Sequence, residues 1–172
     1  MIVLLYMAMS LNGMIDRQNG EEDFLSHDNW RMFLRLVRQH GNLIYGRKTY
    51  EAVRRWGPEY RLDDLPEVDK VIVSRRRQPP PTGWFVAGSP AEALSYLATR
   101  GQKVALLSGG ATTNAAFAQA GLIDEALINV EPAIIAPGVP LFKPDKIDLR
   151  FTLISVKRLG RGGVTLHYRI RK

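Results

Sequence analysis

The stretch Val104-Ala105-Leu106-Leu107-Ser108-Gly109-Gly110-Ala111-Thr112 decides the fold. Its apolar half has the length of a buried parallel strand, which characteristically reads as a continuous apolar run. Two glycines end the run, and an alanine-rich segment closed by Gly121 follows, as expected of a helix. A strand that leads into a helix in this way indicates an open α/β sheet, in which ligands bind beyond the carboxyl ends of the strands.

The paired glycines have a functional and a structural interpretation. Without a Cβ they let the backbone approach a ligand, and the free N–H groups of the following helix attract an anion such as a pyrophosphate. Paired glycines also occur in ordinary tight turns, and a short glycine motif alone is weak evidence for a site. By itself, this stretch predicts the fold better than it predicts a function.

Composition bounds the class of protein. The 172 residues, of which 45% are hydrophobic and 24% charged, predict one globular domain over residues 1–172. The chain has no cysteine, which excludes disulfides and thiolate chemistry and suits a reducing cytoplasm. The apolar residues 1–9 are too few for a signal peptide or a membrane span, so we expect a cytoplasmic protein with no membrane partner.

The formal net charge of +7 favours an anionic partner. A phosphorylated cofactor or substrate would fit, as would nucleic acid, and a basic surface can also have no partner. The basic residues are scattered apart from short clusters such as 75–77, and no basic stripe is interleaved with aromatic residues. Nucleic acid is therefore the weaker prediction.

The remaining chain alternates strands and helices before it ends in a hairpin. Apolar runs predict strands at 2–8, 42–45, 70–73, 84–86, 104–107 and 121–130. Helical spacing and caps predict helices, caps included, at 26–41, 46–57, 89–101 and 112–120. Residues 151–156 and 164–170 flank a glycine-rich turn. We therefore predict an α/β fold in which helices cover both faces of a mostly parallel central sheet and an antiparallel hairpin closes the C-terminus.

Common nucleotide and metal motifs are missing from the sequence. It contains neither a Gly-x-Gly-x-x-Gly fingerprint nor a complete Walker A loop. The three histidines, His27, His40 and His167, have no carboxylate companions at ligand spacing, so no metal site is predicted.

Three strand ends could instead face one anionic ligand. Gly46-Arg47-Lys48-Thr49 puts two cations and a hydroxyl at a helix start, which suits a phosphate. Ser74-Arg75 follows the next strand and suits a second phosphate, such as the 2′-phosphate of NADP. Gly109-Gly110 supplies the third contact. Each segment can also be read as a solvated turn, but three of them in order are more persuasive than any one.

An ordered set of motifs makes this chain resemble the dihydrofolate-reductase-like superfamily. It is most similar to stand-alone relatives of the reductase domain of bacterial riboflavin biosynthesis, from residue 1 to about 170. The resemblance implies helices on both faces of the sheet, a homodimer, and NADPH that passes a hydride to a bound pteridine or pyrimidine. The motifs are Ser10-Leu11-Asn12-Gly13, Tyr45 to Glu51, Val73-Ser74-Arg75, Gly109-Gly110, Gly121 to Glu125 and Gly138 to Phe142.

The resemblance also implies cofactor contacts. Ala8 and Ile15 correspond to positions that flank the nicotinamide. The phosphates correspond to three segments, namely Gly46, Arg47, Lys48 and Thr49; Ser74 and Arg75; and Gly109, Gly110, Ala111 and Thr112. A cis peptide bond between Gly109 and Gly110 is implied as well.

The substrate contacts correspond less well. Asn12 stands where the riboflavin-pathway reductases usually have Asp, and Leu107 stands where they tend to have Glu. Glu22 replaces a phosphate-binding Ser, and a carboxylate there would repel a ribose phosphate. Asn12, Trp30 and Phe33 are the expected substrate contacts, although helical spacing makes core packing the default role of the two aromatic residues.

A dihydrofolate reductase needs a carboxylate on the first helix. Asp28 is the catalytic candidate, although a shift of one position would put Asn29 there instead. Beside Ser26, an acid also simply favours the helix start, and we prefer that interpretation by a modest margin.

These observations predict an NADPH-dependent reductase of the riboflavin-biosynthesis type, acting on a flat heteroaromatic or its ribosyl phosphate, as in 5-amino-6-(5-phosphoribosylamino)uracil. For the phosphorylated substrate, Glu22 must turn away and a cation such as Arg31 or Arg54 must reach the phosphate. One alternative is a dihydrofolate reductase, which requires Asp28 in the cleft. The other is a non-enzymatic anion or nucleic-acid binder.

Overall fold

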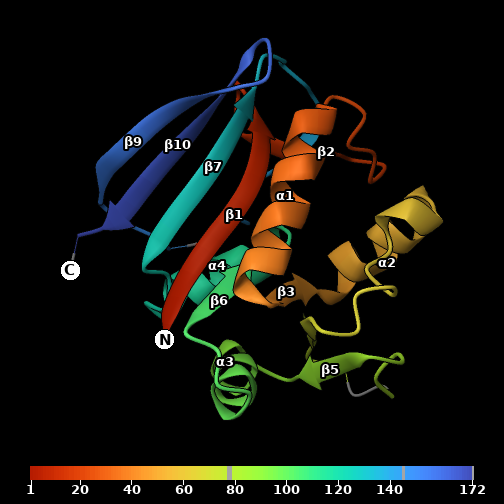
Figure 1. Ribbon diagram of the computed structural model, residues 1–172. Helices are drawn as coiled ribbons and strands as arrows, with labels where there is room; N and C mark the ends of the chain where they lie inside the picture. The colour runs from red at the N-terminus through yellow and green to blue at the C-terminus, as the bar shows by residue number, and fades with distance from the viewer. Residues whose placement is uncertain (77–78, 145, 172) are drawn as a thin grey trace.

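A twisted eight-stranded sheet organises the molecule (Figure 1). The computed structural model describes residues 1–76, 79–144 and 146–171. The strand order is β5-β4-β3-β6-β1-β7-β10-β9, and all neighbours are parallel except the pairs β7–β10 and β10–β9. The strands are β1 (Ile2–Ser10), β3 (Asn42–Gly46), β4 (Asp69–Val73), β5 (Trp84–Ala87), β6 (Val104–Leu107), β7 (Glu125–Glu131), β9 (Phe151–Leu159) and β10 (Gly163–Ile170).

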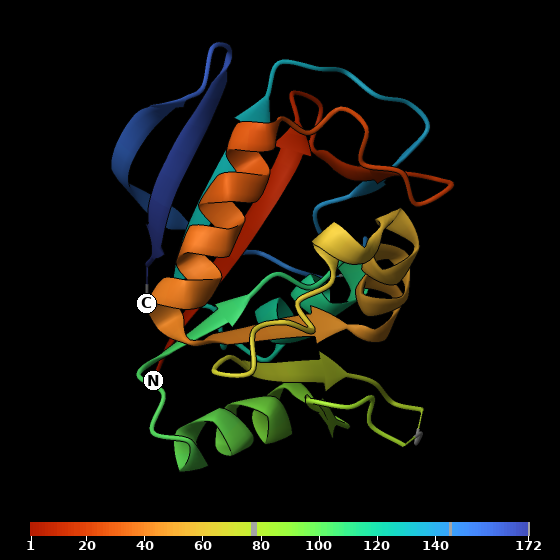
Figure 2. The ribbon, with the colours of Figure 1, turned by 45° about the vertical axis from the view of Figure 1, so that its right-hand side comes forward.

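Helices cover both faces of the sheet, which confirms the predicted fold class. They are α1 (His27–His40), α2 (Arg47–Trp56), α3 (Pro90–Thr99) and α4 (Ala111–Gln119), with a 3₁₀ turn, η1, at Pro58–Tyr60. Figure 2 shows α1 lying along β1 and β7 on one face, with α4 behind the sheet. Successive side chains along β1 point to opposite faces of the sheet, so β1 contributes to the hydrophobic core on each face. Leu4 and Tyr6 pack with α1, whereas Leu5 belongs to the core that contains α3 and α4.

The start of α1 is fixed by its own cap and by β7. The Ser26 hydroxyl accepts a hydrogen bond from the Asn29 backbone N–H at 3.3 Å, as the sequence predicts for an N-cap. The same hydroxyl donates to a carboxylate oxygen of Glu131 at 2.7 Å, and this oxygen also accepts from the Ser26 N–H at 3.1 Å. Because Glu131 ends β7, this contact sets which side of α1 faces the sheet.

A two-stranded sheet, formed by β2 (Met14–Arg17) and β8 (Gly138–Pro140), departs from the prediction. The sequence predicts a loop at residues 10–16, whereas Asp16 pairs with Val139 in an antiparallel ladder. The two strands are very short and far apart in the chain, so no local pattern reveals their pairing. This small sheet carries Asp16 to the substrate side of the cleft described below.

The parallel strands bring three helix starts to one edge of the main sheet. Strands β3, β5 and β6 run in the same direction, and α2, α3 and α4 begin directly after them. This is the edge at which ligands bind in open α/β sheets.

Candidate active site

A cleft of about 1140 Å³ opens at this edge. Its walls come from β1, β2, α1, β3 and α2, from the loop between β2 and α1, and from the first turns of α3 and α4. This volume accommodates a dinucleotide together with a small substrate, since ligand sites commonly span about 300–1,000 Å³. The cleft has a basic end beside the helix starts and an aromatic, acidic end beside α1.

Two of the three helix starts at the basic end have free N–H groups. The N-cap residues of α2 and α4 are Gly46 and Gly110, and neither helix has a side-chain cap. By contrast, α3 is capped within itself. The Ser89 hydroxyl accepts from the Glu92 N–H at 3.2 Å, and the Glu92 carboxylate accepts from the Gly88 N–H at 2.8 Å. The unsatisfied donors of α2 and α4 therefore form the better anion site.

A single hydrogen bond holds these two helix starts together. The Gly110 N–H donates to Thr49 Oγ1 at 2.9 Å. A Cβ added at Gly110 would lie 2.8 Å from the same oxygen, and one added at Gly109 would lie 2.8 Å from Thr113 Cγ2. A side chain at Gly110 would therefore meet α2, whereas one at Gly109 would meet Thr113 of α4, the helix that follows it.

The implied cis peptide bond between Gly109 and Gly110 is wrong, because this bond is trans. A cis bond between residues other than proline costs about 2.5–4 kcal/mol and persists only where the surroundings enforce it. The trans bond already directs the Gly110 N–H to Thr49. Within residues 1–76, 79–144 and 146–171, the cis bond is that between Ala136 and Pro137.

Among the described residues, the cations that line the cleft are Arg47, Lys48, Arg75 and Lys143. Arg47 also pairs with Glu51 one helical turn away. The sequence offered no motif for Lys143, whose backbone N–H donates to the Ala111 carbonyl at 3.0 Å and so anchors it beside α4. A group bearing several phosphate charges would be well matched to these side chains.

Most of the expected cofactor residues reach the cleft, and two lie behind its surface. Ser74 is buried, and its hydroxyl accepts from the Arg76 N–H at 3.1 Å, so it shapes the turn that presents Arg75. Gly109 packs against Thr113 and Gly46. The residues that line the cleft are Ala8, Ile15, Gly46, Arg47, Lys48, Thr49, Arg75, Gly110, Ala111 and Thr112.

Aromatic rings form the wall at the other end. Phe33 stacks between Tyr6 and Tyr45, with ring centroids 6.0 and 6.2 Å away. The ring centroid of Trp30 lies 5.2 Å from that of Phe33 and 5.0 Å from that of Tyr60. Trp30 and Phe33 both line the cleft, although Phe33 is 4% exposed and serves the core as well. The wall suits a flat ring.

Asn12, the third expected substrate contact, is not among the described residues that line the cleft. Its side-chain amide donates to the Ile135 carbonyl at 2.8 Å and accepts from the Ile135 N–H at 3.2 Å. Its oxygen also accepts from the Ser10 hydroxyl at 2.7 Å. These bonds use its amide to join two loops.

Asp28 likewise lies outside the cleft lining as far as the structure describes the chain. Its carboxylate accepts from the Arg31 guanidinium at 2.6 Å. Asn29 faces inward instead, 7% exposed, and its side-chain oxygen accepts from the Tyr6 hydroxyl at 2.7 Å and from the Asn129 amide at 2.8 Å. Burial, followed by the charge of Glu131, raises the pKa of Tyr6 well above its usual value, so Tyr6 stays a neutral donor. A neutral amide thus occupies the inner face of the helix start.

Among the described residues, the acids that line the cleft are Asp16, Glu21, Glu22 and Asp23. The sequence did not identify Asp16 or Glu22 as a functional residue. Burial raises the pKa of Asp16 to about 6, although a backbone hydrogen bond and Arg55 oppose this shift. Burial, and then the charge of Asp16, raises the pKa of Glu22 to about 8. The one signal in the sequence was that Glu22 replaces a serine of the related reductases.

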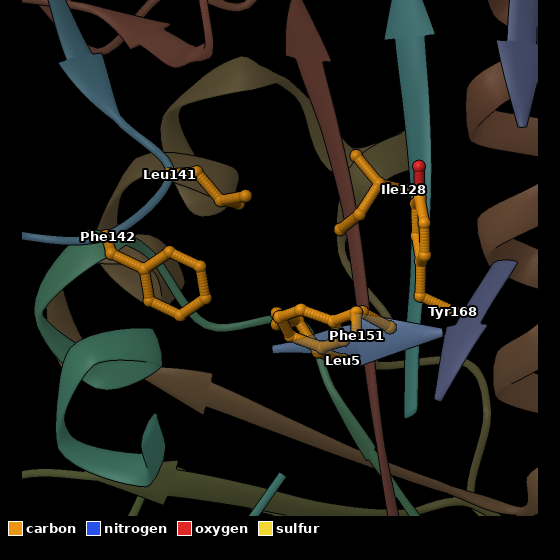
Figure 3. Close-up of a pocket in the computed structure, with 7 residues that line it drawn as sticks. Leu5, Ile128, Leu141, Phe142, Phe151 and Tyr168 are labelled. Carbon is orange, nitrogen blue, oxygen red and sulfur yellow. The ribbon is translucent and has the colours of Figure 1, made fainter. Parts of the chain in front are cut away.

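A second, smaller cavity of about 160 Å³ lies between β1, β7, the C-terminal hairpin and the loop after β8 (Figure 3). Its lining is aliphatic and aromatic: Leu5, Ala126, Ile128, Leu141, Phe142, Phe151 and Tyr168. No charged group of the described residues lines it.

Within residues 1–76, 79–144 and 146–171, no group of three or more metal-binding side chains gathers. In the same part of the chain, none of the helices is both long enough and apolar enough to cross a membrane.

A match to a protein-family model shows which family the chain belongs to. The model of the RibD C-terminal domain matches residues 1–165. The chain belongs to the RibD C-terminal domain family. This confirms the resemblance to riboflavin-biosynthesis reductases with a dihydrofolate-reductase-like fold.

Individual relatives agree with the family and the fold. The uncharacterized protein YyaP of Bacillus subtilis (strain 168) is 24% identical, with 96% of this chain and 93% of YyaP covered. A protein described as a riboflavin biosynthesis protein from Shewanella sp. PV-4 has a structure with a TM-score of 0.82 at 22% identity, covering 100% of both chains. Dihydrofolate reductase from Enterococcus faecalis, solved with NADP(H), has a TM-score of 0.72 at 17% identity, covering 99% of this chain and 97% of that enzyme.

Proposed function

We propose that this protein is an NADPH-dependent reductase that transfers a hydride to a flat nitrogen heteroaromatic. The observation that carries the proposal is the junction of α2 and α4, where the bond between Thr49 and Gly110 aligns two uncapped helix starts. Arg47, Lys48 and Arg75 line the same cleft as this junction. Free N–H groups and cations together match a pyrophosphate and an additional phosphate.

The paired starts of α2 and α4 form what we call the anion cradle, and the fit to the cofactor rests on its shape. A side chain at Gly110 would meet Thr49, so the backbone is bare where a phosphate would cross it. Arg75, on the turn after β4, would hold the 2′-phosphate, and Ala8 and Ile15 would flank the nicotinamide. When bound, the cofactor supplies the hydride. The protein supplies distance, orientation and exclusion of water.

The substrate would lie against the aromatic wall of Trp30 and Phe33, within reach of the carboxyl groups of Asp16 and Glu22. A dihydrofolate reductase is not favoured, because Asp28 pairs with Arg31 outside the cleft lining and Asn29 faces inward. The homodimer, the cytoplasmic location and the single domain expected from the sequence stay predictions.

Calorimetric titration of the purified chain with NADPH and NADH tests the proposal. We expect NADPH to bind more tightly and its absorbance to fall during turnover of a heteroaromatic substrate. The substrates to compare are 5-amino-6-(5-phosphoribosylamino)uracil, its dephosphorylated form and dihydrofolate. No affinity for NADPH, together with steeply salt-dependent binding of DNA, would contradict the proposal and favour the nucleic-acid binder.

A further inference from the structure

The substrate end of the cleft carries acids rather than the cations that a ribose phosphate requires. Arg31 pairs with Asp28, and Arg54 lies 3.4 Å from Asp63. Neither arginine belongs to the described lining of the cleft. The cations that do line it lie on α2, on the turn after β4 and at Lys143, at or near the basic end.

Asp16 and Glu22 reach this end from two adjoining segments. Asp16 lies on β2, and Glu22 lies on the loop that leads to α1. The two carboxyl groups are close enough for the charge of one to act on the other. Burial, followed by the charge of Glu22, raises the pKa of Tyr45 on β3. Both acids line the cleft that the aromatic wall also lines.

Neither carboxyl group forms an ion pair in the described structure, although the Arg17 backbone N–H and the charge of Arg55 lower the pKa of Asp16. Asp16 Oδ1 is buried and has no hydrogen-bond partner among the residues described. Glu22 has no side-chain hydrogen bond or ion pair within the same part of the chain, whereas its neighbour Asp23 pairs with Arg17 at 2.5 Å. Buried polar groups without partners are rare in folded proteins. Donors on a ligand would satisfy both carboxyl groups.

Other charged groups around the pair leave it acidic. Arg55 of α2 acts on Asp16 from a distance, and Arg17 of β2 is already engaged with Asp23. Glu21 and Asp23 on the same loop and His27 at the start of α1 also line the cleft. Tyr45 and Tyr6 are kept neutral by burial. A like charge beside a carboxyl group disfavours its ionisation, so Asp16 and Glu22 do not ionise independently.

We propose that Glu22 and Asp16 form a proton-sharing pair that protonates the substrate and selects an unphosphorylated heterocycle with N–H donors. The inference rests on the proposed function for its hydride source. A hydride from the reduced nicotinamide adds to the carbon of a ring C=N bond, and the pair gives its proton to the nitrogen. The products are the dihydro ring and the oxidised nicotinamide, and the pair takes a new proton from water. A phosphate at the substrate end of the cleft would be repelled by the negative charge of Asp16 and Glu22.

Carbon-13 NMR of the carboxyl groups tests the pair in the cofactor-free chain. We expect Glu22 to titrate near pH 8 and its pKa to fall in Asp16→Asn, since the like charge is gone. Asp148→Asn, which removes a surface carboxylate paired with Arg150, should leave the titration of Glu22 unchanged. An ordinary pKa for Glu22, or no response to Asp16→Asn, overturns the pair.

Binding of two probes to the NADPH complex tests the selection. 2,4-Diaminopyrimidine presents amino N–H donors and, once protonated, a ring N–H, whereas ribose 5-phosphate presents only the anion and hydroxyls. We expect the pyrimidine to bind and Glu22→Gln to weaken it about tenfold or more, the size of a hydrogen bond to a charged group. NADPH affinity should stay the same in this variant.

The outcomes separate the two proposals. Binding of ribose 5-phosphate without the pyrimidine overturns the selection while the reductase stands. If the wild-type chain does not bind NADPH, the proposal of a reductase is overturned. The NMR titration then still decides whether Asp16 and Glu22 form a pair.

Discussion

The hydroxyl of Thr49, in the first turn of α2, accepts a 2.9 Å hydrogen bond from the N–H of Gly110, the N-cap of α4. Two helices that follow different strands of the sheet are joined at their starts by this bond. The bond is made within the chain itself, so it holds the anion cradle in one arrangement and lowers the free-energy cost of ordering it on binding.

Gly110→Val should abolish NADPH binding while the chain still folds. The new Cβ would lie 2.8 Å from Thr49 Oγ1, so the side chain would push the helix starts apart and fill the cradle. Calorimetry measures the affinity, and circular dichroism checks the fold. Ala98→Val, a branched substitution on the exposed surface of α3, is the matched control and should bind NADPH like the wild type. Unchanged affinity in Gly110→Val would place the cofactor elsewhere.

Arg75→Ala should reduce the preference for NADPH over NADH by about 1–3 kcal/mol, the size of a charged hydrogen bond. Arg75 lines the cleft beyond β4, where an additional phosphate can reach it. The matched control is Arg76→Ala, because Arg76 is exposed and is not among the described lining residues. The preference is measured as the ratio of the two dissociation constants. Equal affinities in the wild type would refute the assignment of Arg75.

Glu22 should make the protein less stable as the pH rises. Its folded-state pKa of about 8 lies above the ordinary value of 4.5, so its contribution is present below about pH 4.5 and is lost as the pH rises through 8. Glu22→Gln removes this loss, since an amide does not ionise. In urea unfolding we expect the variant to be more stable than the wild type at pH 9, with a much smaller difference at pH 4. A constant difference across this range would contradict the raised pKa.

Asp28→Asn should affect stability rather than cofactor binding. Asp28 lies in the first turn of α1 and pairs with Arg31, so its charge favours the helix start. We expect a loss of about 0.3–1 kcal/mol in the free energy of unfolding. NADPH affinity should not change. A loss of affinity in this variant would indicate that the carboxylate reaches the cleft.

The sequence predicted the parts of the fold that local physics controls. The cap at Ser26, the spacing of Phe33 and Val37 and the left-handed Gly41 are readable because each depends on neighbours within a few residues. The apolar runs and the turns after them likewise predicted where α2 and α4 begin. By contrast, the pairing of Asp16 with Val139 joins distant segments with no pattern of their own.

The substrate side of the site was less predictable for the same reason. Asp28 and Asn29 differ by one position, and which of them faces inward depends on the contact of Ser26 with Glu131 across the fold. Glu22 was visible only as a departure from a related motif. Its place in the cleft depends on how a loop lies against β3 and α2.

A crystal structure of the wild-type chain with NADPH tests the central claim most directly. The account predicts that pyrophosphate oxygens accept hydrogen bonds from the first-turn N–H groups of α2 and α4, on either side of the bond between Thr49 and Gly110. It also predicts the 2′-phosphate beside Arg75 and the nicotinamide between Ala8 and Ile15. NADPH bound away from these helix starts, or a cleft left empty at saturating NADPH, would contradict it.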